Sequence, residues 1–196
     1  MFQKGHRLLL ESAAAAVADR GLTAQAGALL DGCAREDRYS VGLTHFGYAA
    51  PWRAGRLFAK AVRAHAKSER DGYWWLGRAA HLVSEMASPA HAQGSFHWYG
   101  EPFELYLEEH CDELAALEPA AVAPADAASL ARGLANHART FFADRTRNLP
   151  GFVAHRLGLL RRPTADEVRE QAQALVPLGA GYTAALYRSF LARVRA

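Results

Sequence analysis

The clearest helical stretch of the chain reads Asp71-Gly-Tyr-Trp-Trp-Leu-Gly-Arg-Ala-Ala-His81-Leu-Val-Ser-Glu85-Met-Ala87, with Ser88-Pro89 after it. Alanine and leucine are strong helix formers, and Pro89 predicts the end of the helix because proline cannot continue its hydrogen-bond pattern. Alanine, leucine and arginine also dominate the rest of the chain, whereas β-branched residues are scarce. The sequence therefore predicts an all-α fold.

Further helices follow from apolar spacing and from the residues that start and stop helices. Residues 33–50 and 88–101 are expected to be loops. Thr164 and Glu167 have the spacing of a capping box that begins a helix, and Pro177 and Gly179 are expected to break it. The other helices are expected near Gly5–Asp19, Thr23–Leu30 (ended by Gly32), Pro51–Lys67, Pro102–Leu117, Asp126–Arg147 and Tyr182–Val194. Neither a repeat nor a linker composition is present, so residues 1–196 are expected to form one all-α domain.

Composition excludes several classes of protein. Of 196 residues, 51% are hydrophobic, which suffices for a core, yet no uncharged apolar run approaches the ~20 residues of a transmembrane helix. Because 23 basic residues nearly balance 20 acidic ones, charge gives no reason to expect a stable nucleic-acid partner. Cys33 and Cys111 lie far apart, which argues against a disulfide framework and against a thiolate zinc site. Glu11 interrupts the apolar residues of the N-terminus, so we expect a cytoplasmic protein if Met1 is native and a secreted one if Met1 marks a mature start.

Histidine and glutamate gather in the middle of the chain. His81 and Glu85 are four residues apart and share one helix face, and His91 and His97 follow in the next loop. Glu101 and Glu104 come directly afterwards. A single histidine is most often an ordinary surface or core residue, but imidazole and carboxylate at this density suit Zn²⁺. The motifs of di-iron bundles, HExxH proteases, P-loops and α/β-hydrolases are absent.

The stretch from Trp75 to His91 resembles the central signature of the zinc-dependent phospholipase C superfamily, which also holds the fungal single-strand nucleases. That signature reads approximately LGxxxHxxxDxxxPxH. Four outlying segments match in family order, so the resemblance covers about residues 5–110: Gly5-His6, Gly32 to Asp37, Thr44-His45-Phe46 and Phe103-Glu104-Leu-Tyr106. The chain departs from the family by having Glu85 in place of aspartate and Met1 in place of an N-terminal tryptophan.

The resemblance implies an all-α fold with up to three zinc ions. It assigns one zinc to His45, His81 and Glu85. The second zinc would take His91, His97 and a glutamate, for which Glu104 is preferred and Glu101 remains the alternative. The third would take His6, Glu85 as a bridge, and the amine and carbonyl of Met1. Asp37 matches the carboxylate proposed as general base, and Glu36 is its neighbouring alternative.

The expected function is that of a zinc-dependent phosphodiester hydrolase of the phospholipase C type, in which metal-activated water attacks phosphorus. The substrate would be a phospholipid or a nucleotide. Two alternatives stay open: a single-strand nuclease or nucleotidase on the same trinuclear site, and a protein of the same fold with lost or altered metal chemistry.

Overall fold

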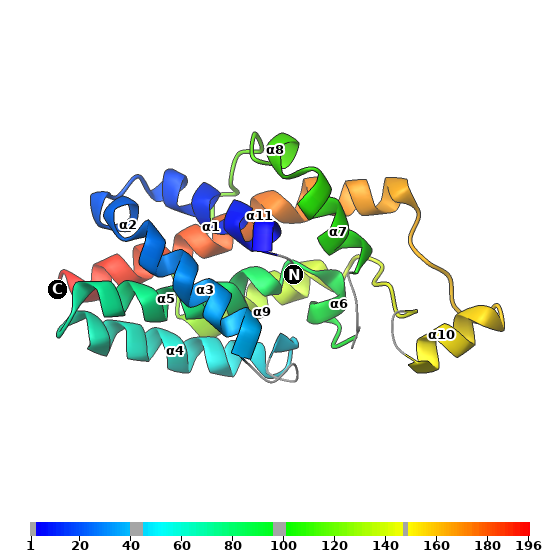
Figure 1. Ribbon diagram of the computed structural model, residues 1–196, viewed down its shortest axis with the longest axis horizontal. Coiled ribbons are helices and arrows are strands. Elements are labelled where there is room, and N and C mark those ends of the chain that lie inside the picture. The colour runs from blue at the N-terminus through cyan, green and yellow to red at the C-terminus, as the bar shows by residue number, and fades with distance from the viewer. Residues whose placement is uncertain (1–2, 40–44, 96–100, 147–148) are drawn as a thin grey trace.

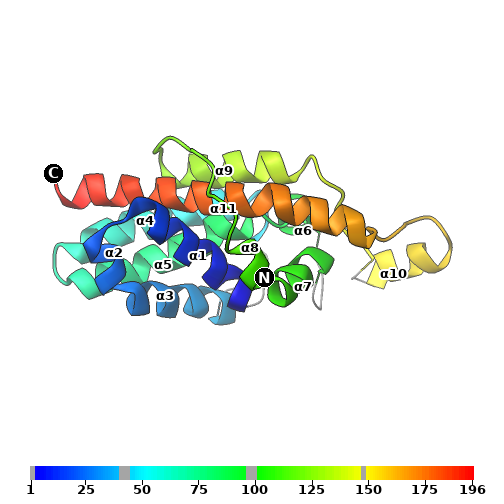
Figure 2. The same cartoon turned by 90° about the horizontal axis from the view of Figure 1, so that it is seen from above.

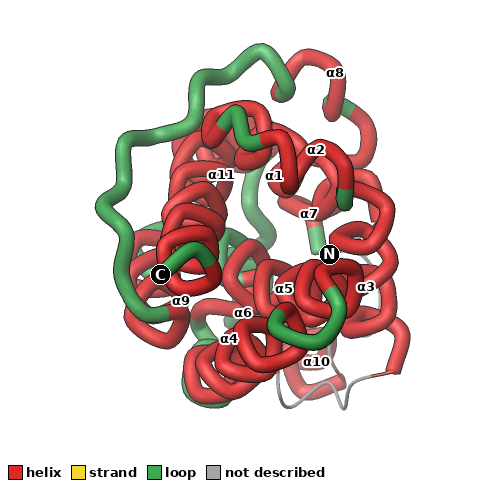
Figure 3. Tube along the Cα trace, turned by 90° about the vertical axis from the view of Figure 1, so that its left-hand side faces the viewer, coloured by secondary structure: helices red, strands yellow, loops and turns green. Residues whose placement is uncertain are grey.

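Most of the long helices run roughly along the longest axis of the molecule, and α3 is inclined across them (Figures 1 and 3). The computed structural model describes residues 3–39, 45–95, 101–146 and 149–196. These ranges contain eleven helices and no strand, which confirms the all-α expectation. None of the described helices has the length and apolar character needed to cross a membrane. The helices are α1 (Gln3–Val17), α2 (Arg20–Ala24), α3 (Ala26–Tyr39), α4 (Ala50–His65), α5 (Glu69–Glu85), α6 (Pro89–Ala92), α7 (Pro102–Glu109), α8 (Cys111–Leu114), α9 (Ala127–Ala138), α10 (Leu149–Arg156) and α11 (Ala165–Val194).

Helix α5 is the most enclosed of the long helices and carries the central histidine and glutamate. Its N-cap is Ser68, whose hydroxyl accepts a hydrogen bond from the Asp71 amide. Helices α3 and α4 pack along it, and α1, α9 and α11 also contact it. Every residue from Ala79 to Glu85 is buried, so any polar side chain near the end of α5 faces protein rather than water.

Helices α3 and α5 cross closely because each contributes a glycine to the contact. A Cβ atom added to Gly32 would collide with the carbonyl oxygen of Trp74, and one added to Gly77 would collide with that of Leu29. Gly32 therefore lies inside a helix and allows a close approach, rather than ending the helix as expected. The predicted loop at 33–50 is wrong in its first part, because α3 continues to Tyr39.

Helix α11 is continuous, contrary to the expected break at Pro177 and Gly179. The capping box of Thr164 and Glu167 begins it as predicted. Proline removes one amide from the helix, but α11 buries residues along its whole length and so remains helical through tertiary packing. Gly179 serves packing, since an added Cβ would lie 3.2 Å from Leu9 Cδ1 and 3.3 Å from Ala87 Cβ.

Two expected helices end early. The helix predicted over Pro102–Leu117 divides at His110 into α7 and α8. The helix predicted over Asp126–Arg147 begins correctly at its Asp126 N-cap but ends at Ala138. Beyond it, the carbonyl oxygens of Phe141 and Phe142 accept hydrogen bonds from side-chain amides instead of from helix amides. The short helix α10, which was not expected, projects from the end of the bundle (Figure 2).

Candidate metal centre

The carboxylate of Glu85 lies at the centre of a buried cluster of histidines. Its Oε2 atom is 2.9 Å from His6 Nε2 and 3.2 Å from His81 Nε2, and its Oε1 atom is 2.9 Å from His91 Nε2. His91 Nε2 also lies 3.1 Å from Glu104 Oε1. The four partners come from α1, α5, α6 and α7, so the cluster forms where these helices meet.

Helix termini and caps bring these residues together. His6 lies in the first turns of α1, which a hydrogen bond from the Gly5 amide to Glu108 Oε1 ties to α7. His91 lies in α6, where Ser88 is the N-cap and Pro89 occupies the first turn. Pro102 likewise opens α7 and places Glu104 in its first turn.

The cluster divides into three groups whose possible ligand atoms lie within 4.8 Å of one another. The first is His45, His81 and Glu85, as the resemblance implies. The second is Glu85, His91 and Glu104, so Glu85 belongs to both. The third is His6, Cys33 and His81. All members of the three groups are buried.

The Nδ1 atoms of two histidines are occupied outside the cluster. His91 Nδ1 lies 3.4 Å from the carbonyl oxygen of His45, which can only accept, so this nitrogen carries the hydrogen. His6 Nδ1 lies 3.0 Å from the hydroxyl oxygen of Ser84. Because Ser84 donates its own hydrogen to the carbonyl of His81, it must accept one from His6. In both rings the Nε2 atom is therefore left to face the carboxylates.

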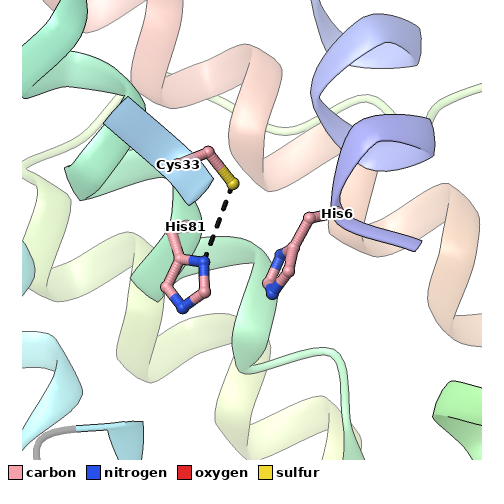
Figure 4. A group of neighbouring side chains, drawn as sticks. All are labelled: His6, Cys33 and His81. Atoms are coloured by element: carbon pink, nitrogen blue, oxygen red, sulfur yellow. Dashed lines mark hydrogen bonds between the residues drawn. The ribbon is translucent and has the colours of Figure 1, made fainter. Parts of the chain in front are cut away.

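The Nδ1 atom of His81 likewise has a partner outside the cluster of carboxylates, the sulfur atom of Cys33. This nitrogen lies 3.7 Å from Cys33 Sγ, a hydrogen-bond distance for sulfur (Figure 4). The Nε2 atom of His81 is close to Glu85 but has no hydrogen-bond partner among the described residues, and the same holds for Nε2 of His6 and His45. Of the two ring nitrogens of His81, Nδ1 is therefore the one engaged by a hydrogen bond, and its partner is the Cys33 sulfur.

His45 and His81 lie beside the Glu85 carboxylate, and their Nε2 atoms have no hydrogen-bond partner among the described residues. Burial lowers the pKa of His45 and, more strongly, that of His81, because the charged imidazolium is disfavoured away from water. The Nε2 atom of a neutral His81 then lies 3.2 Å from a carboxylate oxygen without a hydrogen bond to it, which leaves a buried nitrogen uncompensated. A cation bound by both atoms would compensate it. The nitrogen and oxygen donors thus fit a zinc ion.

His91 differs from the other histidines because it lies between two carboxylates. Burial alone would lower its pKa, but Glu85 and Glu104 outweigh burial and raise it to about 10. Burial likewise opposes the charge of Glu104, whereas the hydrogen bond with His91 helps to lower the pKa of that carboxyl to about 2. Without a metal, a proton on His91 therefore compensates the two acidic groups. A metal ion at this place would take over that role.

The structure separates the two candidate glutamates of the second zinc. Glu104 shares a group with Glu85 and His91. Glu101 is also buried, but its oxygens have no hydrogen-bond partner among the described residues, and burial followed by repulsion from Glu104 raises its pKa to about 8. The geometry therefore favours Glu104, while His97 and Met1 lie outside the described residues.

Of the two candidate general bases, Asp37 and Glu36, the structure describes the side chain of Glu36 alone. Asp37 belongs to α3, but its side chain lies outside the described part of the structure. Glu36 is fully buried, with Oε1 2.5 Å from Arg53 Nε and Oε2 2.8 Å from Arg78 Nε. Two guanidinium groups thus bind its oxygens, so Glu36 forms ion pairs that connect α3 with α4 and α5.

Sequence reasoning missed Cys33 and Ser84. The distance between the two cysteines along the chain argued only against a disulfide framework and a thiolate zinc site, and α3 brings Cys33 to His81 from another helix. A serine directly before Glu85 carries no signal of its own. No protein-family model and no curated protein matches this chain. The assignment of the cluster as a metal centre therefore depends on its own residues.

Proposed function

We propose that the protein is a zinc-dependent phosphoric diester hydrolase with Glu85 at the centre of its metal cluster. One observation supports this above all others. The Nε2 atoms of His6, His81 and His91 converge on the Glu85 carboxylate, while the Nδ1 atom of each ring is engaged on its other side. Outer hydrogen bonds of this kind typically orient histidines that bind a metal.

The described residues suggest how the zinc ions would be held. His45, His81 and Glu85 would hold one ion, and Glu85, His91 and Glu104 a second. His6 would join Glu85 at a third place. The contributions of His97 and Met1 remain expectations from the resemblance.

When bound, zinc would supply Lewis acidity towards a phosphoryl oxygen and would lower the pKa of water. The chain itself would supply three things. The buried carboxylates of Glu85 and Glu104 offset the positive charge, and Ser84 and Cys33 keep the imidazoles in one orientation. The surrounding helices keep bulk water out, which strengthens every charge interaction. Asp37 remains the predicted proton acceptor.

A phosphodiester of a phospholipid is our first choice of substrate, because Phe103-Glu104-Leu-Tyr106 resembles the phospholipase C branch. The single-strand nuclease or nucleotidase remains the alternative on the same residues. Three substrates would distinguish these activities. A phospholipase C should release phosphocholine from phosphatidylcholine, whereas a nuclease should release nucleotides from an oligonucleotide and a nucleotidase should release phosphate from a nucleoside monophosphate.

The first test is the metal content of the purified protein by elemental mass spectrometry, followed by hydrolysis of bis(p-nitrophenyl) phosphate. We expect about three zinc ions per chain and activity that a chelator abolishes and zinc restores. Glu85→Gln keeps the shape of the side chain but removes its charge, and should lose both metal and activity. His137→Asn, an exposed histidine of α9, is the matched control. Absence of metal after reconstitution, or full activity of Glu85→Gln, would refute the proposal.

A further inference from the structure

The segment of residues 145–162 combines positive charge with exposed apolar side chains. Between Asp144 and Asp166 the chain has five arginines and neither aspartate nor glutamate, whereas the whole chain has a net charge of only +3. Helix α10 lies in this segment and projects from the end of the bundle beyond α6 and α7 (Figures 1 and 2). Charge and shape together mark this region as distinct from the rest of the surface.

Large apolar side chains are unusually exposed here. Phe152 and Val153 are each 49% exposed, Leu157 is 68% exposed and Leu159 is 73% exposed. These four residues are half of the eight large hydrophobic residues exposed in the described chain, although they span only residues 152–159. A cluster of this kind on a projecting segment marks a binding surface.

Three arginines of this segment have no acidic partner among the described residues. Arg145 donates to Gln93 Oε1 and Arg162 to Thr146 Oγ1, both of which are neutral acceptors. Arg156 is exposed, and like these two it forms no ion pair within the described ranges. Arg161 differs, because it pairs with both carboxylate oxygens of Glu167 at 2.7 Å. Three arginines thus remain available to an anionic partner.

This region adjoins the candidate metal centre. Gln93 follows His91 by two residues, and its amide donates to the carbonyl oxygen of Phe141 at 2.7 Å. A hollow of about 370 Å³ lies here, and its lining includes Gln93, Arg145 and Leu160. A partner bound to the segment would therefore lie beside the turn that carries His91.

We propose that Arg145 and the exposed side chains of residues 150–162 bind the surface of an anionic lipid bilayer. Aliphatic side chains such as Leu157 and Leu159 enter the boundary of headgroups and acyl chains, while arginines contact lipid phosphates. A second copy of the chain fits less well, because a symmetric contact would bring two sets of uncompensated arginines together. Nucleic acid fits less well, since bases stack on aromatic rings and Phe152 is the one aromatic residue among the four exposed apolar side chains. This surface goes beyond the proposed hydrolase and would act whether or not the cluster cleaves phosphodiesters.

The test is cosedimentation of the full chain with vesicles of phosphatidylcholine alone and of phosphatidylcholine mixed with phosphatidylserine. We expect binding to the mixed vesicles that weakens as salt is added. Arg156→Gln should weaken binding to the mixed vesicles roughly fivefold. Arg63→Gln, which changes an exposed arginine in the last turn of α4, should leave that binding unchanged. The double variant Leu157→Ser/Leu159→Ser should weaken it at least about tenfold without changing the charge.

Circular dichroism and light scattering of each variant would show that the fold and the oligomeric state are kept. Equal binding to both kinds of vesicle, or no binding at all, would overturn the proposal. So would a wild-type dimer that the leucine variant dissociates without any effect on vesicle binding, because the surface would then belong to a second copy. Release of p-nitrophenol from bis(p-nitrophenyl) phosphate, measured with the same variants, tests the hydrolase separately.

Discussion

The Ser84 hydroxyl accepts a hydrogen bond from His6 Nδ1 across 3.0 Å, although the two residues are 78 positions apart in the chain. Ser84 precedes Glu85 directly, so one turn of α5 supplies both the central carboxylate and the group that orients a histidine towards it. This arrangement makes His6 dependent on a residue that does not itself face the cluster.

Replacing Ser84 by alanine should therefore loosen His6 and weaken zinc binding by about 10–100-fold. Competition with a fluorescent chelator would measure the change in affinity. Ser12→Ala, on the same helix as His6 but away from the cluster, should bind zinc like the wild type. Equal affinities of the Ser84 variant and the wild type would contradict the assigned hydrogen bond.

Cys33 is expected to act on His81 through the sulfur–Nδ1 contact and not as a metal ligand. Cys33→Ala should weaken zinc binding by about 10–100-fold, while Cys33→Ser, which keeps an acceptor, should retain most of the affinity. Cys111→Ala is the matched control. Cobalt-substituted protein provides an independent readout, because a thiolate ligand would produce a strong charge-transfer absorption that we expect to be absent.

The length of Glu85 is expected to matter as much as its charge. Its carboxylate spans His6 and His91 at 2.9 Å each, and aspartate would withdraw it by about 1.5 Å. Glu85→Asp should therefore bind fewer zinc ions and hydrolyse phosphodiesters more slowly. Elemental analysis and steady-state kinetics would show both effects, and a variant with full metal content and faster turnover would contradict this geometry.

The glycines of the α3–α5 crossing are expected to limit stability. Gly32→Ala or Gly77→Ala should force the helices apart and cost about 1–3 kcal/mol in the free energy of unfolding. Gly27→Ala is an internal control on the same helix, because a Cβ there has no neighbour within 4 Å and should stabilise the protein by about 0.5–1 kcal/mol. Urea denaturation would compare the three variants, and an unchanged midpoint for Gly32→Ala would contradict the close contact.

Part of the structure was predictable from local signals. The helix around His81 and Glu85, the helix start near Asp126 and the capping box at Thr164 all depend on neighbouring residues, and the structure has each of them. The resemblance also named His6 and His45 as residues that share a zinc ion with Glu85, and it assigned His91 and Glu104 to a separate, second zinc. The structure brings these residues together.

The remaining features depend on contacts between segments far apart in the chain. Glycine is common both at helix ends and at close helix crossings, so the sequence alone predicts a helix end at Gly32. Pro177 lies within a helix that tertiary packing keeps continuous. The contact of Cys33 with His81 arises only once α3 lies across α5, and no pattern along the chain encodes it.

The close crossing of α3 and α5 at Gly32 and Gly77 also determines a distance within the candidate centre, that between Cys33 and His81. Cys33 follows the first glycine, and His81 lies about one turn beyond the second. The separation of the two backbones thus fixes how near the sulfur comes to the imidazole. The two glycines thus set the distance between Cys33 and a candidate metal ligand, so a methyl group added at either one should alter metal affinity although it lies outside the cluster.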